Sequence, residues 1–224
     1  MKAPIAVALD APNLETVKKW ALAAAPAVDV LKVGLEVFLR DGAAAIEVIK
    51  QTDCKLFLDL KLHDIPNTVK GASQSVARFS PDFLTVHASG GPAMIAAAAN
   101  ALPETRITAV TVLTSMSSED LKAIGFEKSA EELAVRLAKM AVENGARAIV
   151  CSPHEVAAIR SVVSSDIVLI TPGVRPVGAD VGDQSRVATP QEAIANGANI
   201  VVIGRPITGA LDIQKAAMEI AASL

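Results

Sequence analysis

The sequence predicts one (β/α)8 barrel domain over residues 1–224, and three observations support this prediction. Short apolar, β-rich runs recur eight times along the chain, and a segment with helix signals follows each run. No Pro/Gly/Ser-rich stretch or charge run marks an internal boundary. Apolar strands that alternate with helices indicate a parallel sheet covered by helices, and eight repeats in a chain of this length favour a closed barrel.

The predicted strands are short and largely uncharged. They are residues 5–9, 28–33, 55–60, 83–87, 107–113, 148–151, 167–170 and 200–203. An open doubly wound sheet is the alternative architecture. A dinucleotide-binding sheet of that kind needs a G-x-G-x-x-G loop after its first strand, and this chain has none there.

Helix starts are expected between these strands. Asn13 is a predicted N-cap, and the prolines at 66, 92, 153 and 190 suit first helical turns. The last helix is expected to begin near Thr208, after the eighth strand.

Composition excludes several classes of protein. Hydrophobic residues make up 51% and charged residues 20%, which suits a compact core and argues against disorder. The net charge of −3 gives no reason to expect a nucleic-acid partner, and no apolar run approaches the ~18 residues of a membrane span. The first strand begins too early to leave room for a signal peptide. Cys54 and Cys151 lack metal or redox spacing, so we expect buried thiols in a reducing cytoplasm.

Polar residues stand at seven of the eight predicted strand ends, where barrels of this class carry their active sites. They are Asp10, Lys32, Asp59, Lys61, His87, Thr114 and Ser115, residues 171–175, and Gly204 with Arg205; a loop at 182–186 adds more. Asp59 and Lys61 are two residues apart, so they should share a strand face while leucines pack behind them, with Asp64 on the loop that follows. Such a cluster is the usual setting for acid and base groups, and a surface ion pair is the alternative.

A phosphate site is expected after the last two strands. Gly204 and Arg205 follow the eighth strand, where barrels commonly hold a phosphate on backbone N–H groups. The guanidinium of Arg205 adds charge-assisted hydrogen bonds, and Gly173 with Arg175 offers a second wall. Alternatively, either arginine could pair with a surface carboxylate.

These motifs closely resemble the orotidine 5'-monophosphate decarboxylase family over nearly the whole chain. The matching segments are ALD (8–10), LKVG (31–34), DLKLHDIPNT (59–68), VHA (86–88), LTS (113–115), TPGVR (171–175), GDQSR (182–186) and GRPI (204–207). Mg²⁺-dependent sugar-phosphate relatives share a D-x-K-x-x-D core with this family but lack the IPNT continuation.

The resemblance implies a set of site residues. Lys32, Asp59, Lys61 and Asp64 match the charged catalytic network of the family, which acts as a homodimer with Asp64 and Thr68 contributed across the interface. The implied substrate contacts are Asp10, Lys32 and Thr68 at the ribose, Asp59 at the carboxylate, Ser115 at the pyrimidine, Gln184 between base and phosphate, and Arg175, Gly204 and Arg205 at the phosphate.

The implied reaction is decarboxylation of orotidine 5'-monophosphate to UMP and CO2 in de novo pyrimidine synthesis, in the cytoplasm. Loss of CO2 leaves a localised carbanion at C6, and the Lys61 ammonium would stabilise it and donate the proton. Neither a metal nor an organic cofactor is expected. Two alternatives are a Mg²⁺-dependent sugar-phosphate aldolase or decarboxylase, and a phosphate-binding barrel without catalysis.

Overall fold

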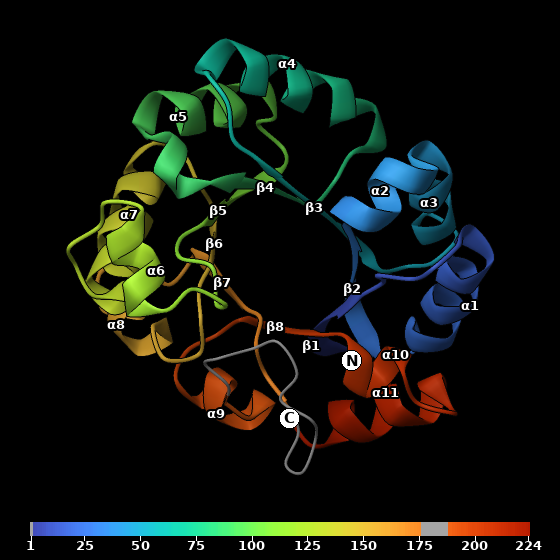
Figure 1. The fold of residues 1–224 in the computed structure, drawn as a ribbon. Helices are drawn as coiled ribbons and strands as arrows, with labels where there is room; N and C mark the ends of the chain where they lie inside the picture. Colours follow the sequence, from blue (N-terminus) through green and yellow to red (C-terminus); the bar gives the residue numbers. More distant parts are fainter. Residues whose placement is uncertain (1, 176–187) are drawn as a thin grey trace.

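The computed structural model describes residues 2–175 and 188–224. Within these residues, eight parallel strands form a closed barrel in the order of the chain, with helices outside it (Figure 1). The strands are β1 (Ala3–Ala8), β2 (Val28–Gly34), β3 (Lys55–Leu62), β4 (Phe83–His87), β5 (Arg106–Val110), β6 (Ala148–Val150), β7 (Val168–Thr171) and β8 (Ile200–Ile203). The predicted (β/α)8 barrel is therefore confirmed.

Strand ends differ from the prediction at two informative places. β3 continues to Leu62, so Asp59 and Lys61 both lie on the strand. β5 ends at Val110, three residues early, although the apolar run continues to Leu113. The Thr111 hydroxyl donates to the Val150 carbonyl at 2.9 Å as the chain leaves the sheet. Apolar character therefore predicted too long a strand, because Val112 and Leu113 serve the wall of a cavity instead.

The helices surround the barrel. The longer ones are α1 (Leu14–Ala24), α4 (Pro66–Val76), α5 (Pro92–Ala101), α7 (Ala130–Glu143) and α11 (Ile213–Ala222). The shorter ones are α2 (Leu35–Asp41), α3 (Ala43–Ile49), α6 (Ser118–Ala123), α8 (Val156–Arg160), α9 (Pro190–Ala195) and α10 (Arg205–Thr208). Asn13 caps α1 by accepting from the Thr16 N–H at 2.8 Å, and prolines open α4, α5 and α9, as predicted.

Two predicted helix starts were wrong. Pro153 does not open a helix, because the Glu155 carboxylate accepts from the Ser152 N–H at 3.0 Å and stabilises a separate turn before α8. The last helix begins at Ile213 rather than near Thr208. There the Asp212 side chain accepts from the Lys215 N–H at 2.9 Å and starts α11 anew, after the short helix α10.

An apolar layer fills the barrel interior. It consists of Ala6, Val30, Phe57, Phe83, Ala148, Ile170 and Ile200, one from each of seven strands. Side chains alternate along a strand, so residues two positions further on face the same way in the next layer. On β1, β2 and β3 these residues are Ala8, Lys32 and Asp59. The apolar layer is thus the floor beneath charged side chains at the C-terminal ends of the strands.

A second, larger core packs the helices against the outside of the barrel, and it includes Cys151. Both cysteines are free thiols. Cys151 is fully buried, as expected, and burial raises its pKa to about 12. Cys54 is only partly buried, so the expectation of a buried thiol was wrong there.

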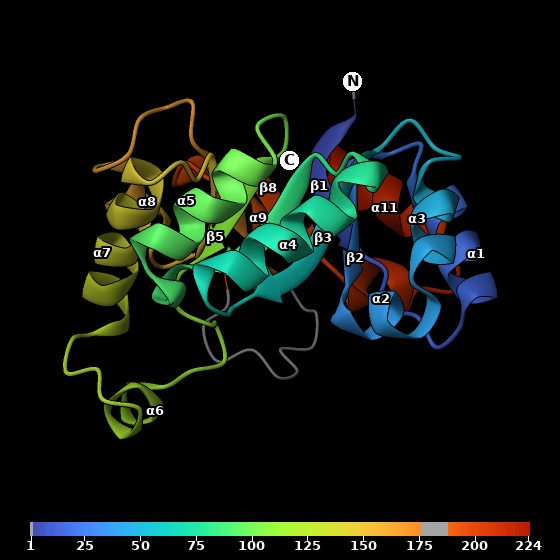
Figure 2. The same cartoon turned by 90° about the horizontal axis from the view of Figure 1, so that it is seen from above.

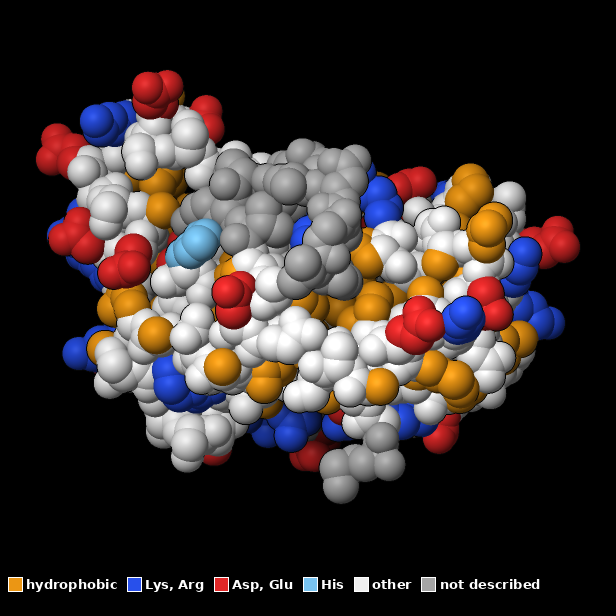
Figure 3. Space-filling model, turned by 90° about the horizontal axis from the view of Figure 1, so that it is seen from below, with side chains coloured by type: hydrophobic (Ala, Val, Ile, Leu, Met, Phe, Trp, Pro, Cys, Tyr) orange, Lys and Arg blue, Asp and Glu red, His pale blue; other side chains and the backbone are white. Residues whose placement is uncertain are grey.

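The segment around α6 projects from one end of the barrel (Figure 2). Ser117 and Asp120 form a reciprocal capping box that starts this helix. The projecting lobe carries acidic and basic side chains in close proximity (Figure 3). Across the described residues, no helix has the length and apolar character needed to cross a membrane.

Candidate active site

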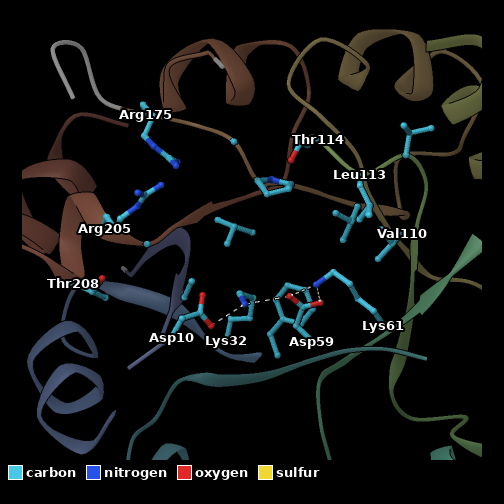
Figure 4. Close-up of a pocket in the computed structure, with 18 residues that line it drawn as sticks. Asp10, Lys32, Asp59, Lys61, Val110, Leu113, Thr114, Arg175, Arg205 and Thr208 are labelled. Atoms are coloured by element: carbon cyan, nitrogen blue, oxygen red, sulfur yellow. Dashed lines mark hydrogen bonds and ion pairs between the residues drawn. The ribbon is translucent and has the colours of Figure 1, made fainter. Parts of the chain in front are cut away.

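A cavity of about 590 Å³ opens at the C-terminal ends of the strands (Figure 4). Its polar lining residues are Asp10, Lys32, Asp59, Lys61, Thr114, Arg175, Arg205 and Thr208. Gly173 and Gly204 also line it, and its apolar lining includes Phe57, Val110, Val150 and Val202. Strand ends far apart in the sequence therefore converge on one space, as predicted from their polar residues.

Four charged side chains form a row of alternating sign along one wall (Figure 4). Lys32 Nζ lies 3.6 Å from Asp10 Oδ1 and 3.2 Å from Asp59 Oδ2. Lys61 Nζ donates to both oxygens of Asp59, at 2.8 and 2.9 Å. Asp59 is thus held between two ammonium groups. The alternative of a surface ion pair between Asp59 and Lys61 does not fit, because Asp59 is only 8% exposed, although the Lys61 side chain is 31% exposed.

Gly34 makes room for this row. A Cβ atom at Gly34 would lie 2.9 Å from Asp10 Oδ1 and 3.0 Å from Lys32 Nζ, closer than side chains tolerate. Any other residue would displace the Asp10 carboxylate and crowd the Lys32 ammonium. The glycine of the LKVG segment is therefore suited to the site itself, because its lack of a side chain leaves space for Asp10 and Lys32.

Mutual attraction keeps the two buried members of the row charged. Burial by itself raises the pKa of a carboxyl, but Lys32 and Lys61 outweigh it, so the pKa of Asp59 lies below its ordinary value. Burial likewise lowers the pKa of an ammonium, but Asp59 and Asp10 outweigh it and raise the pKa of Lys32. Both groups are therefore ionised at neutral pH.

Lys61 occupies an irregular part of β3. Its φ is +49°, in the left-handed region that non-glycine residues seldom adopt. The pairing with β4 shifts there: Leu58 pairs with Leu84, yet Leu62 pairs with Val86. As predicted, Asp59 and Lys61 face the same space while Leu58 and Leu60 are buried behind them; Leu62, predicted to pack there as well, is only partly buried. The bulge directs the Lys61 ammonium onto Asp59, an arrangement common at active-site strand ends.

Two arginines face this row across the cavity (Figure 4). Arg205 opens α10 directly after β8, and Arg175 follows β7 and donates to the Val174 carbonyl at 2.9 Å. The described lining therefore holds four cations, Lys32, Lys61, Arg175 and Arg205, and two carboxylates, Asp10 and Asp59. Its net charge is +2 although the whole chain carries −3. Such a cavity attracts anionic ligands.

Several predicted site residues do not line the cavity. Asp64 and Thr68 are exposed, on the loop after β3 and on α4. Ser115 is exposed, and its neighbour Thr114 lines the cavity instead. His87, at the end of β4, stacks against His63 with the ring centres 5.4 Å apart. Gln184 lies outside the described residues.

Sequence reasoning missed two threonines at the site. Thr208 lines the cavity from α10. Thr85 on β4 is fully buried beneath the row and contacts both Asp59 and the Lys61 backbone. For Thr85, the sequence offered one signal: it is a polar residue in an otherwise apolar strand, two residues before His87. Among the described residues, no cluster of three or more His, Cys, Asp or Glu side chains could hold a metal ion.

Known proteins resemble this chain over almost its full length. The model of the orotidine 5'-phosphate decarboxylase / HUMPS family matches residues 3–220. A relative from Thermobifida fusca (strain YX), named orotidine 5'-phosphate decarboxylase, is 59% identical to this chain. The alignment covers 100% of this chain and 97% of that protein. A relative of the same name from Anaeromyxobacter sp. (strain K) is 51% identical, with 98% of this chain and 97% of that protein covered.

A solved structure shows the same architecture. The crystal structure of orotidine 5'-phosphate decarboxylase from Lactobacillus acidophilus superposes with a TM-score of 0.86 at 36% sequence identity, covering 99% of this chain and 98% of that one. Sequence and structure thus agree over almost the full length. The chain belongs to the orotidine 5'-phosphate decarboxylase / HUMPS family.

Proposed function

We propose that this protein decarboxylates orotidine 5'-monophosphate to UMP and CO2, a step of pyrimidine nucleotide synthesis. The observation that carries the proposal is the Asp59–Lys61 pair at one wall of a cavity whose other wall holds Arg175 and Arg205. The relatives described above, at 51–59% identity, carry the decarboxylase name, which favours this activity over the sugar-phosphate chemistry of the wider family.

The charges of the cavity suit this substrate. Orotidine 5'-monophosphate carries a phosphate at one end and a carboxylate on its base. Arg175 and Arg205 offer bidentate donors for the phosphate, and Lys32 and Lys61 lie across the cavity, where the base would be placed. The apolar residues Val110, Val150 and Val202 line the same cavity and can contact the pyrimidine faces. We therefore place the phosphate at the arginines and C6 near Lys61.

The reaction can then be followed bond by bond. The bond between C6 and the carboxylate carbon breaks, CO2 leaves, and the electron pair stays on C6. The Lys61 ammonium, close to that carbon, stabilises the pair and transfers a proton to it, forming UMP. Asp59 orients the ammonium through two hydrogen bonds and is itself kept ionised by Lys32. Its negative charge opposes the substrate carboxylate, a repulsion relieved when CO2 departs.

The test is loss of the orotate chromophore when the purified protein is mixed with orotidine 5'-monophosphate in the presence of EDTA. We expect rapid conversion to UMP, because no step requires a metal. Turnover of ribulose 5-phosphate only when Mg²⁺ is restored would instead assign the sugar-phosphate chemistry. Tight UMP binding without CO2 release would indicate a binding barrel, and either result would overturn the proposal.

We also infer that the active form is a homodimer in which Asp64 and Thr68 complete the site of the partner subunit. Both residues are exposed in the single chain and neither lines its own cavity. Ile65, between them in sequence, is 66% exposed and adds apolar surface beside these two polar side chains. A surface that joins a reactive carboxylate to exposed apolar area suits a contact with a second copy of the chain.

Mixing inactive Lys61→Ala and Asp64→Ala proteins is expected to restore activity. If subunits reassort at random, half of the dimers are mixed and half of their sites are intact, so about one quarter of wild-type activity should return. The measurement is turnover after the mixed proteins are denatured and refolded together. Mixing Lys61→Ala with the Lys61→Ala/Asp64→Ala double variant is the control, because no intact site can form. A test mixture as inactive as this control would contradict the shared site.

Two further assignments belong to this proposal. Ser115 is proposed to contact the pyrimidine base and Gln184 to bridge the base and the phosphate, as the family resemblance implies. A cytoplasmic location fits a phosphorylated substrate and product, since such anions do not cross membranes unaided.

A further inference from the structure

Thr85 lies at the centre of the irregular pairing between β3 and β4. It sits on β4 and is fully buried, and it does not line the cavity. Its hydroxyl oxygen accepts the Lys61 backbone N–H at 2.8 Å. The same hydroxyl donates to Asp59 Oδ1 at 3.0 Å. One buried side chain therefore contacts both members of the Asp59–Lys61 pair.

The directions of these two bonds are determined by chemistry. An ionised carboxylate can only accept, so the single hydroxyl proton of Thr85 points to Asp59. The lone pairs of the hydroxyl then remain for the Lys61 N–H, which can only donate. Hydrogen bonds thus run from the Lys61 backbone through the Thr85 hydroxyl to Asp59. The Lys61 ammonium closes this chain of hydrogen bonds by donating to Asp59.

This closed chain explains how Lys61 keeps its unusual backbone. Between the Leu58–Leu84 and Leu62–Val86 pairings, β3 advances four residues while β4 advances two. The Lys61 N–H therefore cannot follow the regular ladder, and the Thr85 hydroxyl supplies its acceptor. Conformations such as φ +49° persist only where the surroundings hold them. Thr85 is one of the groups that hold it.

We propose that Thr85 is a positioning residue for decarboxylation: it holds the Lys61 backbone and the Asp59 carboxylate in one arrangement without touching the substrate. This inference rests on the proposed function. Valine has nearly the shape of threonine but no hydroxyl, so Thr85→Val removes both bonds and leaves the packing volume. Thr85→Ser keeps the hydroxyl.

Thr108 provides a matched control. It pairs directly with Thr85 in the register of β4 and β5, is equally buried, and donates its hydroxyl to the Arg106 carbonyl at 2.9 Å. Thr108→Val therefore removes one buried hydroxyl from the neighbouring strand without touching Asp59 or Lys61. General effects of a lost buried hydroxyl appear equally in both valine variants.

The first measurement is kcat and UMP affinity for the three variants. Thr85→Val is expected to lower kcat roughly 10-fold, less than the ~10²-fold that a 1 Å misplacement can cost. The UMP affinity of Thr85→Val should change by less than about 3-fold, because Arg175 and Arg205 are untouched. The kcat values of Thr85→Ser and Thr108→Val should stay within about 2-fold of the wild-type value. A Thr85→Val kcat within 2-fold of wild type, or equal losses in Thr85→Val and Thr108→Val, would overturn the proposal. If Thr85→Val does not fold, Thr85→Ala replaces it with the same expected loss.

The second measurement does not depend on the reaction. Hydrogen exchange of the Lys61 amide, followed by NMR, should become at least about 10-fold faster in Thr85→Val and remain unchanged in Thr108→Val. If wild type fails to convert orotidine 5'-monophosphate, the proposed function fails, yet the exchange result still reports whether Thr85 holds Lys61. Unchanged exchange in Thr85→Val would refute the positioning role even in an active decarboxylase.

Discussion

Lys61→Ala is expected to reduce decarboxylation at least about 10⁴-fold, because one substitution removes both the charge facing C6 and the proton that C6 receives. UMP binding is expected to persist, since Arg175 and Arg205 lie across the cavity from Lys61 (Figure 4). The measurements are single-turnover decarboxylation of orotidine 5'-monophosphate and titration of UMP. Together they separate a loss of chemistry from a loss of binding.

Lys55→Ala is the matched control for this variant. Lys55 begins the same strand, β3, and forms an ion pair with Asp29 at 2.7 Å, but it is exposed and lies at the opposite end of the barrel. Its removal should change kcat by less than about 2-fold. Near-normal turnover by Lys61→Ala would eliminate Lys61 as the proton donor and direct attention to Lys32, the other ammonium of the row.

Asp59→Asn is expected to lower both activity and stability. The variant keeps the shape of the side chain but removes the charge between Lys32 and Lys61, so we expect kcat to fall about 10²- to 10³-fold. Among the described residues, Lys32, only 8% exposed, would retain only Asp10 as an anionic neighbour, at 3.6 Å. Breaking a buried ion pair on one side costs about 3–5 kcal/mol in the free energy of unfolding. Urea denaturation at neutral pH measures this loss.

The stability difference should also depend on pH in a definite direction. The pKa of Asp59 is lowered in the folded protein, so its ionised form stabilises the fold fully above the unfolded pKa of about 4. This contribution is lost as the pH falls through the lower, folded pKa. The difference between wild type and Asp59→Asn should therefore shrink in acid. A difference that stays constant down to the acid transition would contradict the ion-pair explanation.

Asp29→Asn is the control for stability. Asp29 pairs with Lys55 near the other end of the barrel, where both side chains are at least one-third exposed. An exposed pair of this kind contributes at most about 1 kcal/mol. A loss in Asp59→Asn no larger than that in Asp29→Asn would show that burial of the row does not matter for stability.

The fold was predictable from local patterns. Eight apolar runs separated by helix starts sufficed for the barrel, because parallel strands covered by helices leave few other architectures. The charged residues at the strand ends were predictable for the same reason, since a barrel brings the C-terminal ends of its strands together. Asp10, Lys32, Asp59, Arg175 and Arg205 accordingly line one cavity.

Helix boundaries were predictable only where the signal was local. Asn13 and Pro66 start helices with their own side chains. Pro153 has the same local signal, but the Glu155 carboxylate stabilises a turn there instead. The apolar run through Leu113 likewise resembles a strand, although its last residues turn away to line the cavity. In both places, contacts made after the chain folds outweighed local preference.

The sequence by itself determined the barrel, the order of its strands and most of the charged residues at the C-terminal ends of those strands. These features follow from the periodicity of apolar residues and from the positions at which the apolar runs end. Only the tertiary structure decided how those charges pair. Contacts between neighbouring strands produce the alternating row of charges from Asp10 to Lys61. They also account for the space left by Gly34 and for the bulge held by Thr85. Asp59 and Lys61 are two residues apart, but the Asp10–Lys32, Lys32–Asp59 and Lys61–Thr85 contacts join residues more than twenty positions apart, and such contacts exist only once the barrel has closed.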